Sequence, residues 1–395
     1  MKISKYKSYT IVIVAVLVVT IIFGVAMFGS IAGAKPQQLP VALIVLDEGV
    51  TMPDGSTYNA GSTIAQQLQA NAGLPFEWQQ MNSEDKLQQQ FDNQEVYGAI
   101  ILPKELSANL LSLTSPNSTP AIMKAIYNEG MNSQATSVIK QVMHNVLGVM
   151  NEQLSQQLLA QVSTQTGGVI PATIAGKLIS PIMLEEQIVH PIGERQAMGK
   201  APGLLTQMLW ISNLITAALL FFLLRKFNTT TINPLKNRLE QATIGLILPI
   251  ISSALMIWMA SSWYGMELAS SVETWVWLTV VSYSFFYMQS ALLNWIGLPA
   301  MGLLVLLMFF SMPVMNLAPQ FLSDATVTYL YNWTPLRIAT SSIREVLYFG
   351  GLQFNTNAAI TILTIAVVSL VLLIASSITV GRKNNEKQVV LINRL

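Results

Sequence analysis

The chain has 395 residues, of which 52% are hydrophobic and only 10% are charged. A soluble globular protein carries about 25% charged residues, so this composition excludes an ordinary soluble enzyme. The sequence contains no cysteine, which excludes disulfides, zinc–thiolate sites, iron–sulfur clusters and thiol catalysis. The composition therefore predicts a multi-spanning membrane protein with one substantial water-soluble part.

Six stretches are apolar and long enough to cross a bilayer, whose core of about 30 Å needs about 20 residues of helix. The first stretch is free of charge over residues 8–34. The charge-free run 274–323 is too long for one crossing, and Asn294–Pro299 inside it has the composition of a tight turn. The other five spans are expected at about 203–224, 242–263, 274–293, 298–317 and 358–380.

The first span has some features of a cleaved signal peptide. Lys2, Lys5 and Lys7 form a positive segment before it, and Ala32-Gly33-Ala34 resembles a small-residue cleavage site. However, its apolar run exceeds about 20 residues, whereas the apolar region of a signal peptide has about 7–15. We therefore expect an uncleaved transmembrane helix in residues 1–34.

The distribution of Lys and Arg predicts the orientation, because cytoplasmic loops carry an excess of these residues. With the N-terminus inside, the cytoplasmic pieces are 1–8, 225–241, 294–298 and 381–395. These pieces hold 11 Lys and Arg against 2 acidic residues, and the remainder holds 10 against 18. Both termini are therefore expected in the cytoplasm, in a protein of the cell membrane.

Residues 35–200 then lie outside and are long enough for a domain with its own core. Short apolar runs alternate with helical patterns, which favours an α/β fold. Asp54-Gly55 marks a hairpin, and Ser62 or Thr63 is the expected cap of the first helix. We expect strands at 41–46, 74–81, 96–102 and 121–127, and helices at 62–70, from 83, at 132–164 and at about 173–188.

The polar residues of this domain give little indication of a catalytic or metal-binding site. Glu186 and His190 would share one face of a helix and could hold a metal, but no third ligand is in view. Asp47-Glu48 at a strand end is interpreted as turn chemistry rather than a pair of catalytic carboxylates, because no nucleophile or base accompanies it. We expect no catalytic, cofactor or metal site, and no enzyme activity on this chain.

The spans carry no ionisable residue in their apolar middles, which argues against a proton-driven carrier. The chain also lacks the G-x-x-x-x-G-K-[ST] loop, so it does not bind ATP by that route. Neutral polar groups inside the spans either line a passage or join helices by hydrogen bonds, and both interpretations stay open here. These groups are Ser252, Ser253, Tyr283, Ser284, Tyr287 and Gln289.

Two short segments outside the spans stand out. The cytoplasmic loop 229–240 holds Asn233-Pro234, which suits the start of a helix, and its cations suit an anionic lipid or an acidic partner. An amphipathic helix is expected outside over about 335–349, beginning at Pro335 and ending at Gly350. Its Arg337 and Arg344 are two turns apart on one face, and Glu345 follows them.

The order of these parts resembles the ABC-2 type permeases, and within them the YhgE/Pip-like branch of mostly Gram-positive bacteria. The resemblance covers nearly the whole chain. One departure is Leu336-Arg337-Ile338, where that branch usually has an aromatic residue. The matching residues are Leu39–Asp47, Tyr97–Pro103 with Leu106-Ser107, Thr334–Arg337 and Ile343–Gly350.

The resemblance implies an α-helical membrane protein with six transmembrane helices and an extracytoplasmic α/β domain between helices 1 and 2. It implies the permease subunit of an ATP-driven exporter, which pairs with an identical or related permease and with a separate ATP-binding cassette ATPase. The loop that would contact this ATPase comprises Asn233, Pro234, Leu235, Lys236, Arg238 and Leu239.

The alternative is a membrane-anchored scaffold or receptor whose external domain binds a partner, as in phage infection or secretion. No nucleic-acid partner and no cofactor are expected under either interpretation. The identity of the transported substrate does not follow from the resemblance.

Overall fold

The computed structural model describes residues 13–14, 16–18, 20–22, 24, 34–115, 118–165, 172–227 and 234–392. The chain divides into two compact units. One is an α/β domain of residues 35–192, and the other, called the helical unit here, comprises residues 1–34 and 193–395. The first predicted span falls largely outside the described residues, and those described between 13 and 24 are helical.

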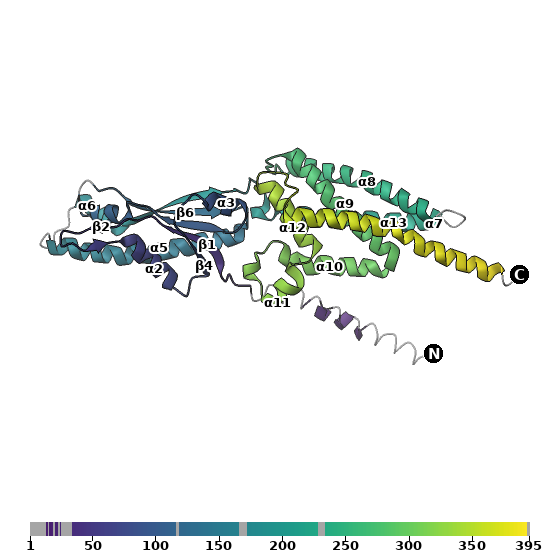
Figure 1. Cartoon of the computed structure of the whole chain (residues 1–395), viewed down its shortest axis with the longest axis horizontal. Helices are drawn as coiled ribbons and strands as arrows, with labels where there is room; N and C mark the ends of the chain where they lie inside the picture. The colour runs from purple at the N-terminus through teal and green to yellow at the C-terminus, as the bar shows by residue number, and fades with distance from the viewer. Residues whose placement is uncertain are drawn as a thin grey trace. The chain divides into compact units, whose positions relative to one another are not determined.

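The α/β domain is built on a five-stranded mixed sheet with the order β4-β1-β5-β6-β7 (Figure 1). β4, β1 and β5 are parallel, β6 is antiparallel to β5, and β7 is parallel to β6. The interior strand β1 reads LPVALIV and is buried on both faces, as its continuous apolar run predicts. The strands are β1 Leu39–Val45, β4 Phe76–Met81, β5 Gly98–Leu102, β6 Ala121–Asn128 and β7 Ile182–Val189, and β2 Val50–Thr51 pairs with β3 Thr57–Tyr58 in a hairpin.

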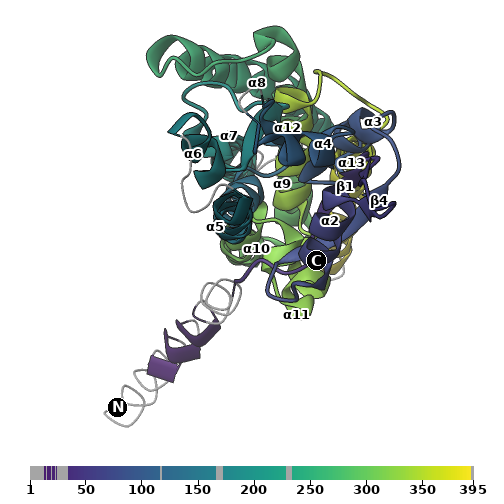
Figure 2. The ribbon, with the colours of Figure 1, turned by 90° about the vertical axis from the view of Figure 1, so that its left-hand side faces the viewer.

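Helices cover both faces of this sheet. Leu87 and Phe91 of α3 pack with Ala42 and Ala99, while the opposite face meets Ile139 of α5 beside Gly98. Figure 2 looks along α5, which runs the length of the domain in Figure 1. The helices are α2 Ala60–Ala70, α3 Leu87–Asp92, α4 Leu106–Ser112, α5 Ser133–Gln165 and α6 Ala172–Ile179.

The strands expected from the sequence are all present, but three local expectations were wrong. The cap of α2 is Asn59, whose side chain accepts from the N–H of Ser62, rather than Ser62 or Thr63. α3 begins at Leu87 instead of residue 83. The expected helix at 173–188 ends at Ile179, because the following residues pair with β6 as strand β7, and this pairing overrides their helical pattern.

The buried carboxylate of Asp47 joins three parts of the α/β domain. Asp47 follows β1 and is 8% exposed. Its oxygens accept from the N–H of Gly61 at 2.8 Å, from the N–H of Ser107 at 3.0 Å and from the hydroxyl of Ser107 at 2.5 Å. Gly61 and Ser107 lie in the first turns of α2 and α4, where unpaired N–H groups favour an anion. Asp47 also accepts from the N–H of Gly49 at 3.5 Å, the kind of turn contact that the sequence suggested, whereas Glu48 pairs with Lys104 at the surface.

The helical unit contains four described helices that are long and apolar enough to cross a membrane: Ala201–Leu224, Pro234–Trp263, Ser271–Ile296 and Asn357–Ile378. The expected span at 298–317 corresponds to an apolar helix of only 17 residues. The helices are α7 Ala201–Phe227, α8 Pro234–Trp258, α9 Ser271–Ile296, α10 Pro299–Met315, α11 Asp324–Thr326, α12 Pro335–Tyr348 and α13 Asn357–Ile392. The short turns are η1 Ala197–Gly199, η2 Met259–Trp263, η3 Pro319–Phe321 and η4 Val327–Tyr331.

α9 is the central helix of this unit and packs against α7, α8 and α13 (Figure 1). Neutral hydrogen bonds join it to all three neighbours, so most of the polar groups inside the spans act as helix–helix contacts. Gly245 of α8 faces Phe286 so closely that a larger residue would not fit. The bonds are Ser253–Thr279, Tyr283 to Leu246 O, Tyr287 to Ala242 O, Asn213 to Ser282, Gln289 to Trp210 O and Trp295 to Leu372 O.

We predict that Asp47 determines the stability of the α/β domain. In residues 35–192 expressed alone, Asp47→Ala leaves buried donors of two helices without an acceptor, and should cost about 3 kcal/mol. Glu48→Ala is the matched control and should change stability little, because its ion pair with Lys104 is exposed. Urea unfolding measures both variants. Equal midpoints for the two would contradict this role, and a non-cooperative transition of the wild-type fragment would contradict an autonomous domain.

Candidate functional site

The first turns of α8 hold the segment that the sequence singled out as a contact for an ATPase. Asn233 lies outside the described residues, and Pro234 is the first residue of α8, as expected. Leu235 and Leu239 are 42% and 48% exposed and, four residues apart, lie on one face of the helix. Lys236 is exposed as well. The segment thus presents two large apolar side chains next to a cation.

Arg238 does not belong to this exposed face. It is half-buried, and its Nη1 donates to Oε1 of Gln241 at 3.5 Å. Gln241 is fully buried and also accepts from Nδ2 of Asn294, at 3.0 Å, in the last turn of α9. Arg238 is thus directed toward Gln241, which in turn contacts α9, and its expected action on a partner together with Lys236 stays a prediction. A local sequence pattern does not predict the contact between Gln241 and Asn294, because 53 residues separate them.

The second expected site, α12, forms where the sequence places it. Thr334 precedes it, Pro335 is its first residue, and Gly350 follows its end with a φ of 82° that favours glycine. Its apolar side, including Leu336, Ala339 and Ile343, is buried against α7, α9, α10 and α13. The helix is therefore part of the bundle along one side and leaves only its polar side partly exposed.

The two arginines of α12 lie on this polar side. The guanidinium of Arg337 stacks on Tyr331 with 4.3 Å to the ring centroid, and its Nε donates to the Tyr331 carbonyl at 2.8 Å. Burial lowers the pKa of Arg337, and Tyr331 opposes this effect while the positive charge of Arg344 adds to it. The two guanidiniums are thus close enough to repel one another. Glu345 accepts from the hydroxyl of Thr356 at 2.7 Å, and the charge of Arg344 also acts on it.

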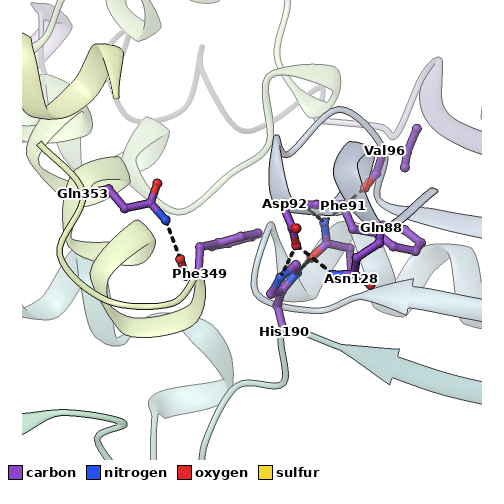
Figure 3. A network of polar contacts seen from close by, with 8 residues as sticks. All are labelled: Gln88, Phe91, Asp92, Val96, Asn128, His190, Phe349 and Gln353. Carbon is purple, nitrogen blue, oxygen red and sulfur yellow. Dashed lines mark hydrogen bonds and ion pairs between the residues drawn. The ribbon is translucent and has the colours of Figure 1, made fainter. Parts of the chain in front are cut away.

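In the α/β domain, His190 belongs to a polar network that also holds Asp92 and Asn128 (Figure 3). Its Nε2 lies 3.1 Å from Oδ1 of Asp92, and its Nδ1 lies 3.0 Å from Oδ1 of Asn128. Asn128 in turn donates to the carbonyls of Phe91 and Val96. Burial lowers the pKa of His190, and the Asp92 carboxylate opposes that shift without reversing it.

Glu186 belongs to a different cluster. It accepts from Tyr127 at 3.0 Å and lies 3.2 Å from Lys140 and 3.0 Å from His144. Because residues 182–189 form a strand, Glu186 and His190 do not share a helix face, and each has its own partners. Within the described residues, no group of three metal-ligating side chains occurs.

A groove lies between α2 and α5, with a volume of about 450 Å³. Its lining combines the amides of Gln67, Asn71, Asn145 and Gln153 with Leu68, Val146, Val149 and Met150. None of these lining residues is charged. The groove has the volume of a small-molecule site and suits an uncharged ligand that both donates and accepts hydrogen bonds.

We predict that Glu186 makes the α/β domain sensitive to acid. Burial alone would raise the pKa of Glu186, but hydrogen bonds from Lys140 and Tyr127 and the charges of Lys140 and His144 outweigh it and lower the pKa. The resulting stability is present above the unfolded value of about 4.5 and is lost as the pH falls through the lower native pKa. Melting of residues 35–192 between pH 3 and pH 6 should therefore depend less on pH in Glu186→Gln than in the wild type. Parallel curves would contradict this prediction.

Comparisons with known proteins place the chain in a family. A profile described as "Protein of unknown function (DUF3533)" matches residues 9–372. No curated protein matches. Among solved structures, "a domain of a putative ABC type-2 transporter from Thermotoga maritima MSB8" is similar at 12% identity and a TM-score of 0.21, over 38% of this chain and 84% of that chain. A TM-score this low supports no conclusion about the fold or the function of this chain. Because the family profile covers most of its length, the chain belongs to the DUF3533 family.

Proposed function

We propose that this protein is the permease subunit of an ABC-2 type exporter and that the start of α8 is its contact with a cytoplasmic ATPase. The observation that carries the proposal is the exposed pair Leu235 and Leu239 on a helix that continues directly into a membrane span. Such a helix transmits a displacement at its exposed end into the bilayer. Apolar anchors surrounded by polar groups are the usual energetic centre of a protein–protein contact.

The contacts of α8 support this role, because they connect the docking segment to the centre of the bundle. Arg238, Gln241 and Asn294 link the first turns of α8 to the last turn of α9. Further hydrogen bonds between α8 and α9 follow along both helices. Movement of the start of α8 would therefore act on α9 first.

The same proposal includes the topology: six transmembrane helices, both termini in the cytoplasm and an extracytoplasmic α/β domain. It also includes a dimer of permeases, membership of the YhgE/Pip-like branch and an origin in a Gram-positive bacterium. The charge distribution supports the orientation, with 11 Lys and Arg against 2 acidic residues in the pieces assigned to the cytoplasm.

A second candidate function is supported by the groove between α2 and α5. Its neutral amides and apolar floor suit a ligand of the α/β domain, as a receptor or scaffold would require. Association with an ATPase would distinguish the two candidate functions, because a receptor or scaffold does not need an ATPase.

We predict that the α/β domain and the C-terminus lie on opposite sides of the membrane. The chain has no native cysteine, so Ser62→Cys in α2 and Asn384→Cys provide two reporters without background. An impermeant maleimide should label only the first in intact cells and both after lysis. Labelling of Asn384→Cys alone in intact cells would reverse the orientation.

We predict that Leu235→Ala combined with Leu239→Ala weakens the association with the ATPase about thirtyfold, because truncation of a buried anchor costs about 2 kcal/mol or more. Co-purification in mild detergent and substrate-stimulated ATP hydrolysis measure this. Leu246→Ala with Ile250→Ala is the matched control, since this pair is similarly exposed on α8 but lies within the span expected at about 242–263. Unchanged association in the first variant, with normal insertion, would exclude the segment as the contact.

A further inference from the structure

Within the described residues, neither Arg337 nor Arg344 of α12 has a carboxylate within 4.0 Å, although the charge of Arg344 also acts on the neighbouring Glu345. In the part of the chain that the structure describes, the ion pairs within 4.0 Å all belong to the α/β domain, at Glu48, Asp92 and Glu186. Both arginines are half-buried, so part of their hydration is lost without a carboxylate to replace it. This arrangement is unfavourable unless an anion from outside the chain completes it.

The guanidiniums of Arg337 and Arg344 differ in the number of contacts that hold them in place. Arg337 is held by Tyr331, through the ring and the backbone carbonyl, and its Nη1 donates weakly to Ser341 at 3.4 Å. Within the described residues, the guanidinium of Arg344 makes no hydrogen bond or ion pair. Since positions 337, 341 and 344 lie along one stripe of the helix, both cations and the Ser341 hydroxyl border the same strip of surface.

The residues just before α12 indicate what this strip faces. Tyr329 and Trp333 are 72% and 55% exposed, and Tyr331 lies between them. Exposed Tyr and Trp side chains at the end of a helical bundle are typical of the headgroup layer of a membrane. Guanidinium groups bind phosphate with paired, charge-assisted hydrogen bonds.

We propose that Arg337 and Arg344 form a binding site for the phosphate of an anionic phospholipid headgroup. The inference rests on the membrane placement of α12 in the proposed function, but it does not require an ATPase or transport. Ser341 contributes a hydroxyl, and Tyr331 holds Arg337 in position. The acyl chains of the same lipid would continue along the apolar exterior of the bundle, which a free phosphate ion cannot do.

The test uses the purified full-length protein in neutral detergent, titrated with phosphatidylglycerol or with phosphatidylcholine, and thermal unfolding reports binding. Each basic residue near an anionic lipid contributes about fivefold in affinity. Phosphatidylglycerol should therefore bind at least tenfold more tightly than phosphatidylcholine. Arg337→Gln with Arg344→Gln should abolish most of this preference, with a loss of about thirtyfold. Lys86→Gln with Lys104→Gln removes two exposed charges of the α/β domain and should preserve the preference.

Three results would overturn the proposal: equal affinity for the two lipids, an unchanged preference in the double arginine variant, or equal loss in the lysine control. Displacement of the lipid by millimolar inorganic phosphate would assign the site to a free anion instead. If the double variant does not fold, Arg344→Gln alone decides the question, because Arg344 holds no bond within the described chain, and it should lose about fivefold. Failure of the ATPase to co-purify would leave these expectations unchanged.

Discussion

The helical unit depends on neutral hydrogen bonds between α9 and its neighbours. In a bilayer the lipid tails are as apolar as the helices, so burial of apolar surface alone does not hold helices together. Close packing at Gly245 and the bonds that Tyr283, Tyr287 and Gln289 make to backbone carbonyls provide that cohesion. Because none of these groups is charged, the cohesion does not require ionisable residues in the apolar middle of the spans.

The α/β domain differs in that the carboxylate of Asp47, which follows β1, is buried. Asp47 is favourable there only because Gly61 and Ser107 direct N–H and O–H groups at it from two helix starts. At the surface of the domain, Lys104 pairs with Glu48. The domain is thereby arranged around a fixed polar contact, whereas the helical unit is arranged around close-packed neutral faces.

The two candidate contacts of the helical unit follow from charges and apolar groups that this packing leaves unused. At the start of α8, Leu235 and Leu239 remain exposed although they are large and apolar. On α12, Arg337 and Arg344 remain without carboxylates although they are half-buried. Each of these arrangements is costly for an isolated chain and favourable with a suitable partner. Both features are therefore compatible with the proposed contacts.

The sequence by itself determined the long apolar helices α7, α8, α9 and α13, the strands β1, β4, β5 and β6 and the start of α12 at Pro335, because these follow from local hydropathy, periodicity and capping. Only the tertiary structure decided that residues 182–189 form a strand, since that outcome depends on pairing with β6, about sixty residues away. It likewise separated Glu186 from His190 and turned Arg238 toward Gln241. Side-chain partners distant in the chain follow from packing, which a local pattern does not encode.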